Sequence, residues 1–185
     1  MSRLLPLLLY LICCASVRAE TPSQFSKRFF HALYKWEVRG APDNKELNRL
    51  SPYLGSELLQ LFKRVEIQRD QEHTGIKHKH RNDPNPPILK GIWSKEGDLF
   101  TSVAESFSTF AIGKPQWRRE RMNVPVHLEY GDAKPASSWT VTLILDKNDK
   151  AWVVSDILDE DGESLMAHLT GSIAENERYL QSLRE

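Results

Sequence analysis

The chain has 185 residues, of which 40% are hydrophobic and 27% charged, with 25 basic and 25 acidic side chains. This length suits a single domain, and the composition excludes collagen-like, low-complexity and wholly disordered chains. A formal charge of zero argues against a nucleic-acid-binding protein that depends on a basic surface, and two cysteines are too few for a disulfide scaffold.

The first nineteen residues have the pattern of a secretory signal peptide. Arg3 gives a positive start, an apolar run follows over 4–14, and Val17 and Ala19 occupy the two positions that a signal peptidase recognises. We therefore expect cleavage after Ala19, a periplasmic or secreted protein, and one mature domain over 20–185. The alternative is a buried N-terminal helix. The run is too short to remain as a stable membrane anchor.

Two amphipathic helices are expected at the start of the mature chain. Apolar residues recur at helical spacing from Phe25 to Trp36, with Ser23 as the N-cap and Gly40 at the end. A short helical segment over 44–50 follows. Ser51-Pro52 then opens a helix with an apolar stripe over 54–65.

The helical spacing of apolar residues is lost over 66–97, a segment that contains several Gly, Asn and Pro residues, and we expect an irregular loop there. Such a segment is functional, partly disordered or wrongly assigned, and the sequence leaves all three open. Four segments then alternate between apolar and polar residues as strands do, at 106–112, 122–130, 139–145 and 151–157. A final helix is expected from 162–163, with an end over 172–185 that frays.

Helices followed by a meander of about four strands predict an α+β domain. Short connections favour antiparallel neighbours, and alternation favours a sheet with one buried face. We expect a curved antiparallel sheet with the N-terminal helices packed on its concave face. A cone of this kind often encloses a pocket.

Several segments resemble the bacterial domain-of-unknown-function 3828 family. They are Asp83-Pro84-Asn85-Pro86-Pro87, Gly97-Asp98-Leu99-Phe100-Thr101-Ser102 with Glu105, Trp152-Val153-Val154-Ser155-Asp156-Ile157, and Leu50-Ser51-Pro52-Tyr53-Leu54. The resemblance implies a fold like nuclear transport factor two, also described as a cystatin-like cone, in exported bacterial proteins, and it implies no established activity. The chain lacks the lipoprotein motif that some such proteins carry, so the resemblance brings no membrane anchor.

Two clusters are candidates for contact with a partner. His78 and His80 lie in a basic run that is a solvated loop, a pH-sensitive contact or a weak metal site. Trp117, Arg118 and Arg119 belong to a basic patch that we place on the turn between the first two strands. That patch either binds an acidic surface or keeps a sheet edge soluble.

Four residues are candidates for lining a ligand pocket: Trp93, Asp98, Glu105 and Asp156. Alternation places Asp156 on the same face of the last strand as Trp152 and Val154. If that face is concave, Asp156 is a buried general base or a carboxylate held by an arginine or by loop amides.

The sequence contains no glycine-rich phosphate loop, nucleophile elbow or zinc-protease motif, and we expect no metal and no cofactor. The leading hypothesis is an exported, non-catalytic module that binds a small molecule or an envelope protein. The alternatives are an interaction or immunity protein that blocks a partner through exposed loops, and an isomerase- or dehydratase-like enzyme with a pocket carboxylate.

Overall fold

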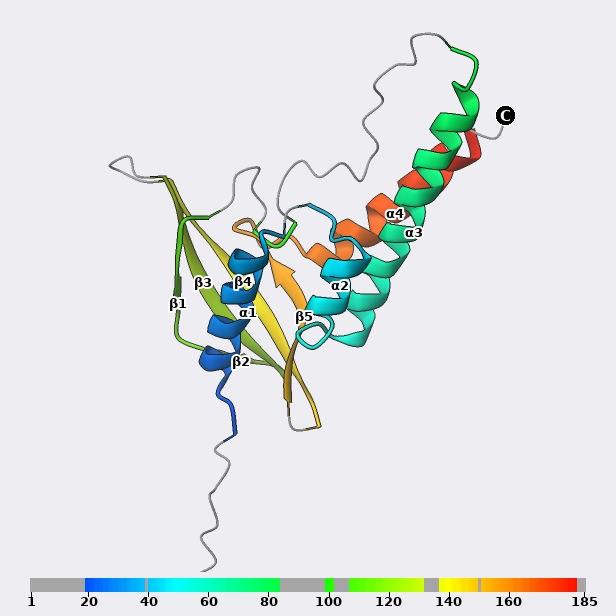
Figure 1. The fold of residues 1–185 in the computed structure, drawn as a ribbon. Coiled ribbons are helices and arrows are strands. Elements are labelled where there is room, and N and C mark those ends of the chain that lie inside the picture. Colours follow the sequence, from blue (N-terminus) through cyan, green and yellow to red (C-terminus); the bar gives the residue numbers. More distant parts are fainter. Residues whose placement is uncertain are drawn as a thin grey trace, which may run out of the picture.

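Helices pack on one side of a curved antiparallel sheet, which makes this an α+β protein (Figure 1). The structure is a computed structural model that describes residues 19–38, 40–83, 99–101, 107–131, 137–149 and 151–182. The elements of these residues are α1 (Pro22–Trp36), α2 (Asn44–Leu50), α3 (Ser56–Lys79), β1 (Thr109–Ile112), β2 (Gln116–Arg118), β3 (Arg121–Tyr130), β4 (Ser137–Asn148), β5 (Ala151–Leu158) and α4 (Leu165–Ser182).

The sheet has the strand order β1-β3-β4-β5, with β2 also paired to β3, and every pairing between strands is antiparallel. The sequence predicted about four strands. The fifth, β2, lies inside the basic segment that the sequence assigned to a turn. Its short length and fully exposed residues explain why alternation did not reveal it.

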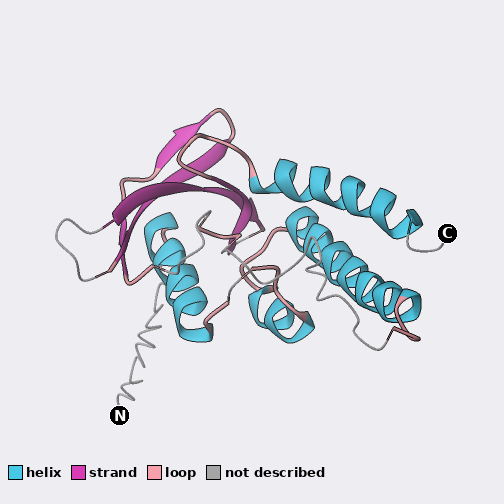
Figure 2. Cartoon of the chain, turned by 90° about the horizontal axis from the view of Figure 1, so that it is seen from above, coloured by secondary structure: helices cyan, strands magenta, loops and turns pink. Residues whose placement is uncertain are grey.

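Helix α1 lies in the concave side of the sheet, as Figure 2 shows and as the sequence predicted. Its apolar face brings Phe25, Phe29 and Phe30, all fully buried, against the sheet, where β1 and β3 are its nearest strands. Rings from α3 and the 99–101 segment complete the cluster: the Phe62 and Phe100 centroids are 5.3 Å apart. Among the described residues, aromatic side chains therefore occupy the part of the concave side that α1 covers.

The structure contradicts the expected start of the irregular loop at 66, because α3 continues to Lys79. The stripe that faces the protein interior becomes polar there, since Glu66, Gln68 and Glu72 are all buried. Hydrogen bonds to neighbouring elements allow this polar face of the helix to be buried. Gln68 Nε2 donates to the Ile173 carbonyl of α4 at 3.1 Å, and Asn44 Nδ2 donates to Glu66 at 3.1 Å.

Helices α3 and α4 run side by side in the same direction and extend beyond the sheet (Figures 1 and 2). Helix α4 reaches Ser182, so the predicted final helix is confirmed through that residue. None of the helices in the described ranges combines the length and apolar character needed to cross a membrane.

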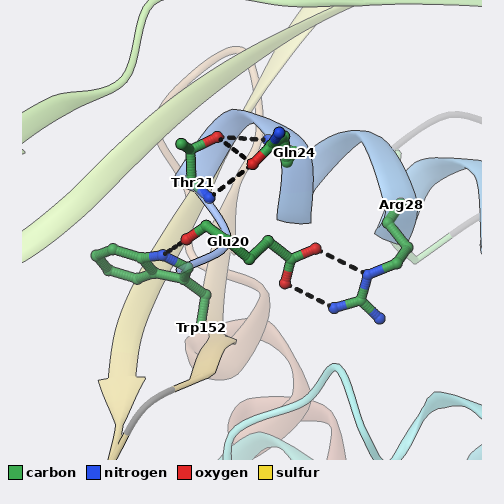
Figure 3. Close-up of polar contacts among 5 residues, drawn as sticks. All are labelled: Glu20, Thr21, Gln24, Arg28 and Trp152. Carbon is green, nitrogen blue, oxygen red and sulfur yellow. Dashed lines mark hydrogen bonds and ion pairs between the residues drawn. The ribbon is translucent and has the colours of Figure 1, made fainter. Parts of the chain in front are cut away.

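Glu20 and Thr21 form the polar contacts at the start of α1 (Figure 3). Thr21, rather than the predicted Ser23, is the N-cap of α1, and it forms a capping box with Gln24. Arg28 donates two hydrogen bonds to the Glu20 carboxylate, at 3.0 and 2.9 Å, and the Trp152 indole donates to the Glu20 carbonyl at 3.0 Å. The hydrogen bond to Glu20 raises the pKa of Arg28, so this guanidinium stays charged at every ordinary pH.

Candidate functional site

The β2–β3 hairpin presents the basic residues that the sequence singled out. Residues 116–118 pair with 121–123, and Arg119 and Glu120 form the tip. Arg119 has a φ of 57°, a left-handed conformation that costs a residue with a side chain about 1–2 kcal/mol. Glycine would adopt this turn without that cost, so the tip carries a guanidinium at the expense of backbone strain.

The hairpin places its tryptophan and its arginines on opposite faces. Trp117 pairs with Met122, which belongs to the concave core, whereas Arg118 pairs with Arg121. Because side chains alternate along a strand, both arginines lie on the outer face of the sheet. Like charges directly opposite each other destabilise a sheet, and only Arg121 is partly balanced, by Asp146 at 3.6 Å. Within the described ranges, neither Arg118 nor Arg119 has an ion-pair partner.

A β-bulge determines the direction of Asp156. Leu145 pairs with Val154, but the preceding residue, Ile144, pairs with Asp156, so Ser155 is an extra residue in β5. An extra residue inverts the alternation of the strand. Asp156 therefore faces outward beside Ile144, and the predicted placement on the same face as Val154 is wrong.

The carboxylate of Asp156 caps helix α4. Its Oδ1 accepts hydrogen bonds from the backbone N–H groups of Ile157, at 2.8 Å, and Met166, at 3.0 Å. Its Oδ2 accepts from the Ser164 hydroxyl at 2.6 Å. Of the two roles that the sequence left open, the structure shows the second, a carboxylate held by backbone amides. An oxygen engaged in this way is poorly placed to remove a proton from a substrate.

An open groove of about 730 Å³ lies on the outer face, beside the hairpin. Asn123, Ile144 and Asp156 form one row of its lining, since they are aligned across β3, β4 and β5. The remaining lining residues are Arg118, Arg119, Glu120, Arg121 and Leu158. The groove thus contains three guanidinium groups and two carboxylates. Of the carboxylates, Glu120 is exposed and Asp156 is already hydrogen-bonded. Both the volume and the charge suit an anionic ligand.

A smaller hollow of about 310 Å³ adjoins this groove, because Arg121 lines both. It lies between the start of α3 and the ends of β4 and β5. Its lining includes Glu57, Asp146, Lys147 and Ser155. We call the two hollows together the outer trough.

Trp117 forms an exposed aromatic surface on the other side of the hairpin. Its side chain is 63% exposed, and its ring centroid is 6.1 Å from that of the nearly buried Trp152. Lys147 Nζ lies 5.8 Å from the centre of the Trp152 ring. An exposed tryptophan next to arginines has the composition of protein-binding hot spots.

His78 and His80 lie at the C-terminal end of α3, not in the loop that the sequence predicted. Cations in the last turn of a helix are stabilised by the helix dipole, which gives this basic run a structural role. His80 Nδ1 is 3.8 Å from Asp83, and His78 is exposed. Among the residues that the structure describes, no three potential metal ligands gather.

Three of the four predicted pocket residues, Trp93, Asp98 and Glu105, lie outside the described residues. Sequence reasoning missed Asn123 and Ile144 because they are single residues on the less apolar face of their strands. The alternation of β3 and β4 could have placed them on the outer face. Their alignment with Asp156 depends on the bulge, which has no marker such as glycine in β5.

Comparison with known proteins returned no match: no protein-family model, curated protein or solved structure corresponds to this chain. The geometry of the hairpin and the outer trough is therefore the basis for assigning a function.

Proposed function

We propose that the protein is an exported, non-catalytic binding module whose binding site is the basic groove on the outer face of the sheet. The observation that carries this proposal is the placement of Arg118, Arg119 and Arg121 around one groove. Two of these guanidinium groups have no ion-pair partner among the described residues, and two lie directly opposite each other. An anionic ligand would offset the repulsion between these guanidinium groups.

The packing of the concave face supports an outer site over an internal one. Fully buried phenylalanines from α1 and α3 occupy the interior of the sheet. The order of the elements and the helix on the concave face agree with the fold like nuclear transport factor two that the family resemblance implies.

The contacts of Glu20 support export. Glu20 is the first residue of the chain predicted after cleavage, and its side chain and carbonyl are already bound by Arg28 and Trp152. We expect that the full chain, expressed in an exporting bacterium, yields a periplasmic or secreted protein whose mass corresponds to a start at Glu20. Recovery from the cytoplasm with Met1 in place would contradict export.

Reversing the charge of Arg118 should have opposite effects on the stability of the protein and on its binding of a ligand. We expect Arg118→Glu to raise the free energy of unfolding by about 0.5–1 kcal/mol, because it replaces a like-charge pair with Arg121 by an opposite-charge pair. The same substitution should remove a species that the unmodified protein retains in native mass spectrometry of a periplasmic extract. Urea unfolding measures the first effect.

The matched control is Lys63→Glu on the exposed side of α3, which changes charge equally at a distance from the groove. Retention of the same species by Arg118→Glu would refute the groove as the binding site. Turnover of a retained small molecule would instead refute the non-catalytic role.

A further inference from the structure

We propose that the partner is another protein, one that places an acidic segment in the groove beside the hairpin and an apolar side chain against Trp117. This inference rests on the proposed function and names the class of ligand. It requires that both faces of the β2–β3 hairpin are used at once.

The hairpin itself argues for a macromolecule. Arg118 and Arg121 point to the outer face, while Trp117, between Gln116 and Arg118, points to the opposite face. A small anion in the groove could contact the arginines but could not reach the tryptophan. A protein that closes around the tip contacts both, and it also meets Arg119 at the strained turn.

The groove beside the hairpin has the charge for an acidic segment. Its lining holds Arg118, Arg119 and Arg121, of which Arg121 pairs with Asp146. Its own carboxylates are those of Glu120, which is exposed, and Asp156, which accepts hydrogen bonds from Ser164 and Met166. Arg118 and Arg119 have no ion-pair partner among the described residues, so they are the groups that can bind carboxylates of a partner.

The composition of the chain argues against nucleic acid as the partner. Removal of residues 1–19, with Arg3 and Arg18, leaves 23 basic and 25 acidic side chains out of the original 25 and 25. A protein with this balance has no overall positive charge to attract a phosphate backbone along a length of nucleic acid. Exposed tryptophan and arginine are the residues most enriched at the energetic centres of protein interfaces.

The test uses a fluorescein-labelled peptide of alternating Glu and Ala that ends in Leu-Leu, about a dozen residues long, as in extended-chain recognition. We expect this peptide to bind the purified protein, as measured by fluorescence anisotropy, and the same peptide with Lys in place of Glu not to bind. The double variant Arg118→Glu/Arg119→Glu should weaken binding by about tenfold or more. Trp117→Ala should weaken it by about fivefold or more.

The matched control is Lys45→Glu/Lys63→Glu, which makes the same change of charge on exposed positions of α2 and α3 and should leave binding unchanged. Circular dichroism of each variant confirms that it is folded. Failure of the acidic peptide to bind, or equal binding by Trp117→Ala, would overturn the protein-partner inference. If sodium pyrophosphate still binds and depends on Arg118 and Arg119, the proposed function stands with a small anion as ligand. If neither probe depends on these arginines, the proposed function fails as well.

Discussion

Replacing Phe29 with alanine should lower the free energy of unfolding by about 3–5 kcal/mol, as truncation of a buried aromatic residue does. Phe29 is fully buried, and its ring lies 5.8 Å from Tyr53, 5.7 Å from Phe30 and 6.1 Å from Phe100. These contacts join α1 to the segments on either side of it. Urea unfolding followed by circular dichroism measures the loss.

The size of this loss in stability distinguishes a filled core from a ligand pocket on the concave face. The matched control is Ile67→Ala on α3, where the side chain is 57% exposed and the change should stay within about 0.5 kcal/mol. If Phe29→Ala costs as little as this control, the concave face is not a filled core. A ligand pocket inside the sheet would then replace the outer groove as the best-supported site.

Replacing Asp156 with alanine should lower the free energy of unfolding by about 2–4 kcal/mol. The substitution removes the acceptor of the Met166 N–H in the first turn of α4, worth about 1 kcal/mol, while Ser164 Oγ still accepts from Ala167. It also takes the acceptor from the Ile157 N–H and the Ser164 hydroxyl, which costs about 1–3 kcal/mol more. Because α4 packs along α3, loss of this acceptor should also increase hydrogen exchange in the first turns of α4, near Met166.

Asp156→Asn distinguishes this structural role from the catalytic one that the sequence left open. The amide retains an oxygen that can accept from Met166 and Ile157, so the loss of stability should be smaller than for alanine. Glu160→Ala, at an exposed position nearby, serves as the control and should leave stability unchanged within about 0.5 kcal/mol. A stable Asp156→Ala protein that has lost turnover of a bound substrate would assign Asp156 to catalysis instead.

The sequence predicted the fold class because the elements that define it have strong periodicity. Helix α1 and strands β3 and β4 bury one face each, and their apolar residues recur at the expected spacing. The second half of α3 could not be predicted in this way. Its covered face includes the buried Glu66, Gln68 and Glu72, and Glu66 and Gln68 form hydrogen bonds with residues far away in the sequence, Asn44 and Ile173.

The site was predicted in part. Trp117, Arg118 and Arg119 were identified from composition, but their division between two faces depends on the short strand β2. Asp156 was identified as a residue of interest and assigned to the wrong face. A bulge depends on the register between two strands, and alternation within one strand cannot reveal it. Without that register, the row of Asn123, Ile144 and Asp156 cannot be recognised.

The most direct test of the outer site is amide chemical-shift mapping by NMR as the acidic peptide is added to the protein. We expect the largest changes over 117–123 and at Ile144 and Leu158, with α1 residues Phe25 to Leu33 unaffected. Shifts concentrated in α1 and the inward-facing residues of the sheet, with the hairpin unchanged, would contradict the account.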